Sequence, residues 1–119
     1  MVSTQVHLDA YQLSLDFLVF ANQCARQLPS TQSELCAQLL RASTGLVLSL
    51  AEGPSQSRTS LAQPYRLACD RAAESAALLD ACARLSLLDH AGHHAGTQLL
   101  VSVVSLCVHA RSFAPPLES

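Results

Sequence analysis

Three neighbouring histidines are the residues whose spacing comes closest to a metal site. His90, His93 and His94 lie three and four residues apart, a spacing at which imidazoles can bind zinc or nickel weakly. Asp89 is the only carboxylate or cysteine beside them, so the ligand set is incomplete. Because two glycines interrupt the stretch, we expect residues 89–96 to form a solvated loop or the frayed start of a helix, without a metal ion.

The other reactive side chains show no recognisable catalytic spacing. The five cysteines contain no Cys-x-x-Cys pair, and no glutamate has a histidine three residues on, as helical di-metal sites require. We expect the cysteines to pack as small hydrophobic residues; they are Cys24, Cys36, Cys69, Cys82 and Cys107. With no nucleophile placed beside a base and no glycine-rich phosphate loop, we expect neither an enzyme nor a cofactor.

The composition favours helices that are buried over much of their surface. The chain has 119 residues, of which 50% are hydrophobic and 13% charged, against about 25% charged in an average soluble domain. Pro29 and Gly53-Pro54 interrupt the helical periodicity, and short connections favour antiparallel neighbours. We therefore predict an all-α protein, an up-down-up-down antiparallel four-helix bundle forming a single domain. Its helices are expected at about 6–27, 32–52, 60–88 and 95–112, followed by a loose tail at 113–119.

The second predicted helix carries one polar stripe on an otherwise apolar surface. Its members recur every three or four residues and share a face: Glu34, Gln38, Arg41, Gly45, Ser49 and Glu52. The stripe is either a solvated face or a polar seam against another helix. We prefer the seam, in which Arg41 pairs with a carboxylate such as Glu52 or Glu74. Gly45 favours it, because a glycine that costs about 1 kcal/mol within a helix permits close approach of a neighbour.

The same stretch resembles a known sequence signature. The residues in register are Gln38, Arg41, Ala42, Ala51, Glu52 and Gly53, and Tyr11 and Glu74 also fit. Over about residues 8–112 the chain resembles the small four-helix-bundle proteins of ribosomal RNA intervening sequences. That family includes the accessory protein of diversity-generating retroelements. Gly45, Ser49 and Arg71 depart from its usual serine, asparagine and serine.

The distribution of apolar residues predicts self-association. The first helix has two large apolar sets, and one bundle cannot easily bury both. We assign one set to the core, namely Leu8, Tyr11, Leu15 and Leu18. We assign the other to a subunit interface, namely Leu13, Phe17, Phe20 and Cys24. The family resemblance implies a ring of five subunits, so we expect a homo-oligomeric scaffold or adaptor, most simply a homopentamer.

Binding of RNA or single-stranded DNA is the alternative function, as the retroelement relatives suggest. The candidate contacts are Arg26, Arg58, Arg66 and Arg71, but the formal net charge is −2 and the chain has no lysine. Dedicated nucleic-acid binders are usually basic. Since no apolar stretch reaches the roughly 20 residues of a membrane span and no signal segment is recognisable, we expect a cytoplasmic protein without membrane or small-molecule partners.

Overall fold

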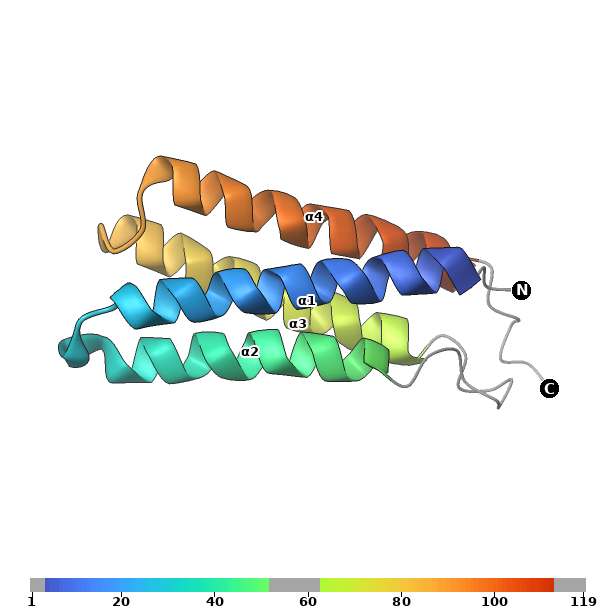
Figure 1. The fold of residues 1–119 in the computed structure, drawn as a ribbon, viewed down its shortest axis with the longest axis horizontal. Helices are drawn as coiled ribbons and strands as arrows, with labels where there is room; N and C mark the ends of the chain where they lie inside the picture. The colour runs from blue at the N-terminus through green and yellow to red at the C-terminus, as the bar shows by residue number, and fades with distance from the viewer. Residues whose placement is uncertain (1–3, 52–62, 113–119) are drawn as a thin grey trace.

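The computed structural model describes residues 4–51 and 63–112, which form an all-α, up-down-up-down four-helix bundle (Figure 1). The fold predicted from the sequence is confirmed. The helices are α1 (Thr4–Gln27), α2 (Ser33–Ala51), α3 (Gln63–Arg84) and α4 (His90–Ser112), with a 3-10 turn, η1 (Ser30–Gln32), between α1 and α2. Within residues 4–51 and 63–112, the helices contain no apolar stretch of the length that a membrane crossing needs.

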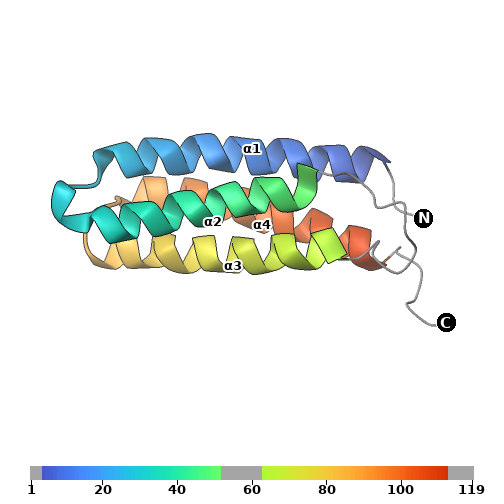
Figure 2. The ribbon, with the colours of Figure 1, turned by 90° about the horizontal axis from the view of Figure 1, so that it is seen from below.

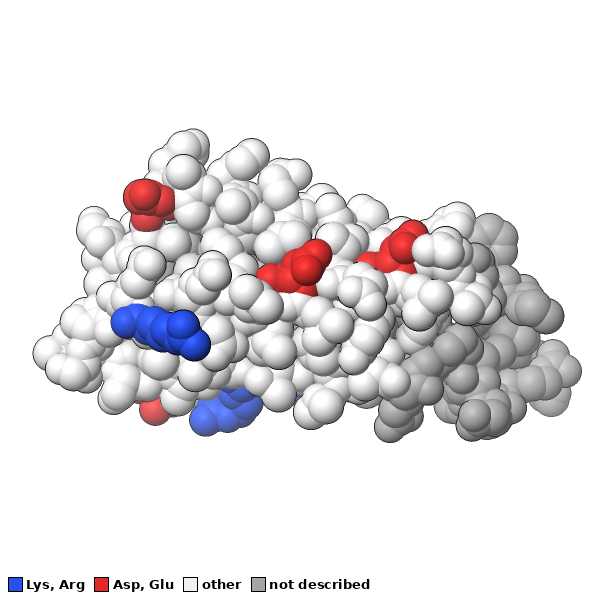
Figure 3. All heavy atoms as spheres, in the orientation of Figure 1, with Lys and Arg blue, Asp and Glu red and all other residues white. Residues whose placement is uncertain are grey.

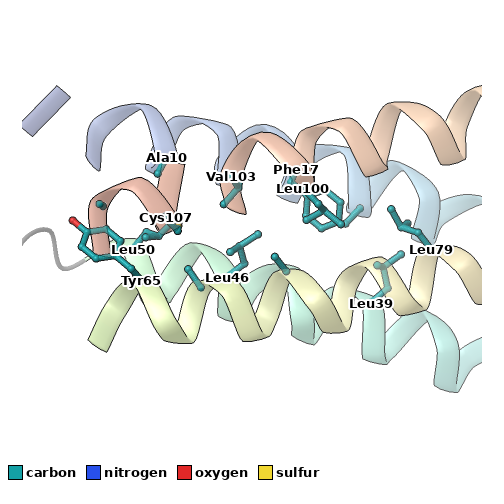
Figure 4. Packing of buried hydrophobic residues seen from close by; sticks show 14 residues of the cluster. Ala10, Phe17, Leu39, Leu46, Leu50, Tyr65, Leu79, Leu100, Val103 and Cys107 are labelled. Carbon is teal, nitrogen blue, oxygen red and sulfur yellow. The ribbon is translucent and has the colours of Figure 1, made fainter. Parts of the chain in front are cut away.

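Each helix packs against two neighbours, so the four axes occupy the corners of a square. α1 and α3 each contact both α2 and α4, and a second view shows α2 and α3 side by side (Figure 2). Large side chains from all four helices meet between them, including Phe17, Leu46, Leu79 and Val103 (Figure 4). Burial of this shared apolar core is what holds the helices together.

The inward face of α1 differs from the one that the sequence predicted. Most of the residues that α1 buries have small side chains. The buried residues are His7, Ala10, Ser14, Phe17, Ala21 and Ala25. Phe17 is completely buried, and Leu13, Phe20 and Cys24 are partly buried against the same core. The assignment of Phe17 to a subunit interface is therefore wrong, whereas for Leu13, Phe20 and Cys24, which keep part of their surface exposed, it stays a prediction. The helix turns its small residues inward because they allow close packing of neighbouring helices.

The connection between α3 and α4 is shorter and more ordered than predicted. α3 ends at Arg84 instead of Leu88 because Ser86 adopts a left-handed conformation, with φ of 60°. The backbone amide of Leu87 then donates to the carbonyl of Cys82, and that of Ser86 donates to Ala83, at 2.8 and 3.0 Å. These two bonds form a Schellman motif, which satisfies the last carbonyls of a helix.

The histidine-rich stretch is the start of α4, so of the two alternatives predicted for residues 89–96 the loop is wrong and the beginning of a helix is found. α4 begins at His90, five residues before the predicted start. Asp89 caps it: the carboxylate oxygen Oδ1 accepts a hydrogen bond of 2.7 Å from the backbone amide of Gly92. This is the usual N-cap geometry, in which a side chain satisfies a free amide of the first turn.

Candidate functional site

An open groove of about 870 Å³ lies between α2 and α3. We call it the α2–α3 groove. It is lined by Gln38, Leu40, Arg41, Ala42, Thr44, Gly45, Leu48, Arg71, Glu74, Ala77 and Leu78. Alanine, glycine and leucine make up most of the lining, and two arginines and one glutamate supply its charges. The groove therefore combines apolar surface with cationic groups.

Gly45 brings α2 and the Arg71 side chain of α3 close together. A Cβ atom at Gly45 would lie 3.0 Å from both Cδ and Nε of Arg71. The arginine side chain therefore lies across the glycine, in space that another residue's side chain would occupy. The predicted close approach at Gly45 is present, but the group that approaches is the side chain of Arg71.

Arg71 also pairs with the carboxylate of Glu74, one helical turn further along α3. Its Nη1 atom donates to both carboxylate oxygens at 3.3 Å, and the two side chains are 40% and 55% exposed. Partly exposed pairs of this length contribute little stability. The contact orients the guanidinium without enclosing it, and another anion could approach.

Arg41 does not make the ion pair with Glu74 that the sequence predicted. It is exposed and has no ion pair with any residue that the structure describes, while Glu74 pairs with Arg71. The predicted partner Glu52 lies outside the described residues. The prediction of an ion pair between Arg41 and Glu74 is therefore wrong. The Arg71 side chain crosses Gly45 and forms the ion pair with this carboxylate instead.

The two other polar members of the predicted seam bond within α2 itself. Gln38 Nε2 donates to Glu34 at 2.9 Å on the exposed surface, and Ser49 Oγ donates to the carbonyl of Leu46 at 2.7 Å. Neither side chain reaches α3 through a hydrogen bond in the part of the chain that is described. The stripe is thus largely a solvated face, interrupted at Gly45 by an arginine from α3.

The candidate nucleic-acid contacts do not gather on one surface. Arg26 lies near the end of α1, and Arg66 lies near the start of α3, at opposite ends of the bundle (Figure 1). Arg71 lies in the groove beside Glu74, and Arg58 lies outside the described residues. A phosphate backbone is bound by clustered positive charge, and the described arginines are dispersed.

A buried polar contact links α1 to α3 at the end of the bundle opposite η1. His7 Nδ1 and the Tyr65 hydroxyl lie 2.8 Å apart, and both residues are buried. Burial lowers the pKa of His7, while a hydrogen bond with the backbone of Leu50 acts in the opposite direction. A neutral imidazole can accept a hydrogen bond from the tyrosine hydroxyl and donate one to the backbone of Leu50, so His7 joins three helices.

Histidines and cysteines form no metal-binding group among the described residues. No three side chains of histidine, cysteine, aspartate or glutamate lie close enough in that part of the chain to hold a metal ion. His93 Nε2 lies 2.7 Å from Asp80 Oδ1 and links the start of α4 to α3.

All five cysteines are free, and burial is the main cause that raises the pKa of Cys107 to about 12. A thiol with that pKa is unreactive at neutral pH.

Two residues of the site were missed by sequence reasoning. The sequence predicts Arg71 as a nucleic-acid contact and as a departure from the family signature, and it assigns no role to Leu48, which lines the groove and is 63% exposed. Leu48 lies seven residues after Arg41, on the same side of α2, and this spacing was a signal that could have found it.

Comparisons of the chain with protein-family models, with curated proteins and with solved structures find no match.

Proposed function

We propose that this protein is a non-enzymatic helical-bundle scaffold or adaptor that works as a homo-oligomer. The observation that carries the proposal is the exposure of large hydrophobic side chains on every helix of the bundle. Those on the helices are Leu8 and Val19 of α1, Leu48 of α2, Leu67 of α3, and Val101 and Val108 of α4. Exposed hydrophobic side chains that adjoin one another usually mark an interaction site, and the proposal places these side chains in subunit contacts.

The sparse charge of the surface supports the same proposal. On the face formed by α1, α2 and α4, charged side chains are few and far apart (Figure 3). Interfaces between subunits are depleted in charged residues at their centres, and cyclic association is a common way to cover such surfaces. We propose a ring of five, the number that the family resemblance implies.

Light scattering coupled to size exclusion tests the proposal directly. The chain has a mass of 12.7 kDa, so a pentamer is expected at about 64 kDa at micromolar concentration. A stable species of 12.7 kDa would overturn the proposal, whereas a dimer or tetramer would overturn only the number five. The measurement should be repeated at high salt, because association through apolar surface is largely retained there.

The same preparation distinguishes a scaffold from a nucleic-acid-binding protein. Protein purified at low salt is expected to show the absorbance ratio at 260 and 280 nm of a protein free of nucleic acid. Co-purifying RNA that is released steeply as salt rises would instead indicate a phosphate-driven complex. That result would replace the proposed function with the alternative one.

A further inference from the structure

The outward face of α1 is apolar and acidic. Leu8 and Val19 are 45% and 58% exposed, and Asp9 and Asp16 are exposed beside them. No lysine or arginine occurs in α1 before Arg26. Over most of its length the exposed face of the helix therefore carries hydrophobic side chains, glutamines and carboxylates, and its only charges are negative.

The α2–α3 groove has the opposite charge on a similarly apolar background. Arg41 is exposed without an ion pair to any described residue, and Leu48 projects from the same side of α2. Arg71 lies in the groove, held by Glu74 through a single nitrogen at 3.3 Å. Counting the two arginines and the glutamate, the groove carries one net positive charge.

These charges decide which of the two surfaces can meet in a self-associated protein. If α1 met α1 of a second copy around a two-fold axis, Asp9 and Asp16 would face carboxylates of the same kind. If groove met groove, Arg41 and Arg71 would face guanidinium groups. Like charges brought together across an interface cost binding energy, so only the pairing of α1 with the groove is complementary.

We infer that the outward face of α1 in one copy docks into the α2–α3 groove of the next copy. This inference rests on the proposed self-association and names the two surfaces that make it. Leu8 and Asp16 are eight residues apart, or about 12 Å along a helix, and Arg41 and Leu48 are seven apart, or about 10.5 Å. With the two helices antiparallel, Asp16 lies beside Arg41 while Leu8 lies against Leu48.

A contact between two different surfaces has a consequence for assembly. Each copy presents one α1 face and one groove, so every copy can bind two neighbours. Such a head-to-tail contact produces a closed ring when the rotation between copies divides a full turn, and an open filament otherwise. The inferred contact is therefore compatible with the proposed ring, whereas a two-fold dimer would have to form the same contact twice, with α1 of each copy in the groove of the other.

A charge-exchange experiment tests the contact. The full chain is prepared as Asp16→Arg, as Arg41→Asp and as the double variant carrying both changes, and the mass is followed by sedimentation over a concentration series. Each single variant places like charges in every contact, so we expect the dissociation constant to rise by about tenfold or more. In the double variant every contact again pairs opposite charges, and we expect the mass of the wild type to return.

Asp70→Arg is the matched control, since Asp70 is exposed on α3 and does not line the groove. It changes the charge as Asp16→Arg does and is expected to leave the mass unchanged. Circular dichroism at 222 nm verifies that each variant keeps its helices. If the wild type is oligomeric but the single variants keep its mass, or the double variant fails to recover it, this contact is overturned and the proposed function stands. If the wild type is a 12.7 kDa monomer, both are overturned.

Discussion

Two regions of the bundle each contain a glycine within a helix, with opposite consequences. One region is where α4 packs against α1 and α3, and the other is where α2 packs against α3. At Gly96 of α4, a Cβ atom would lie 2.7 Å from Leu79 Cδ1 and from Phe20 Cζ, and closer still to Phe20 Cε2. At Gly45 of α2, the nearest atoms belong to the flexible side chain of Arg71 at 3.0 Å. The first glycine accommodates core side chains, and the second lies in an open groove.

The difference shows that a glycine within a helix of this bundle can have either of two structural roles. Gly96 is buried, and the ring of Phe20 fills the space beside it. Gly45 is only partly buried, and the groove around it is open to solvent. One site is closed and intolerant of added volume, while the other is open and adaptable.

The largest effect is expected in the closed region, at Phe17. Its side chain is completely buried, so Phe17→Ala removes a whole aromatic ring from the core. We expect the free energy of unfolding to fall by about 3–5 kcal/mol, measured by urea denaturation. Val19→Ala, measured at a low protein concentration so that self-association does not contribute, is the control, because Val19 is 58% exposed and its truncation should cost less than about 0.5 kcal/mol. Equal losses for the two would contradict the observed orientation of α1.

Gly96→Ala is expected to produce the next largest loss. The added methyl group overlaps Phe20 and Leu79, and overpacking of a core costs about 1–3 kcal/mol. The better helix propensity of alanine returns about 1 kcal/mol, so we expect a net loss of up to about 2 kcal/mol by urea denaturation. A variant more stable than the wild type would show that the region around Gly96 is not closed.

Acid is expected to lower the stability of the bundle through His7. Protonation disturbs the hydrogen bond between His7 and Tyr65 and leaves the core side chains in place. Burial holds the pKa of His7 below its usual value of 6.5 in the folded state. The unfolded chain therefore binds a proton first as the pH falls, so stability is present above about pH 6.5 and is lost progressively below it. His7→Gln should flatten this dependence in thermal melts between pH 7.5 and 5. An unchanged slope would exclude His7 as its source.

Gly45→Ala tests the open region with the same substitution as at Gly96. Arg71 is partly exposed and flexible, so its side chain can shift by the few tenths of an ångström that a methyl group needs. The gain in helix propensity then dominates, and we expect stability to rise by up to about 1 kcal/mol. A loss of stability comparable to that of Gly96→Ala would show that the space beside Gly45 is as closed as the space beside Gly96.

The smallest effect is expected for Arg41→Ala. A buried ion pair broken at Arg41 would cost about 3–5 kcal/mol, but the side chain is exposed and has no ion pair among the described residues. We therefore expect a change within about 0.5 kcal/mol in the unfolding free energy of a variant kept at low concentration. A larger loss would restore the polar seam that the sequence predicted.

The pattern of the sequence was sufficient for the number, order and direction of the helices. Helical periodicity and short connections predicted four antiparallel helices, and the structure confirms them. Periodicity predicts such elements because it reflects a shared apolar face. Boundaries were less accurate, since Asp89 as a cap and Ser86 in a left-handed conformation depend on local hydrogen bonds that no hydrophobic pattern records.

The orientation of each helix was decided only by the tertiary structure. α1 is apolar on most sides, so its sequence permits several inward faces, and the chosen face carries Ala10, Ser14 and Ala21 beside Phe17. Likewise, nothing in the order of residues indicates that Arg71 of α3 crosses Gly45 of α2. The sequence by itself determined which segments are helical and that they share a core. Which faces meet depends on how side chains from different helices fill a common volume at high density, and that is a property of the assembled bundle.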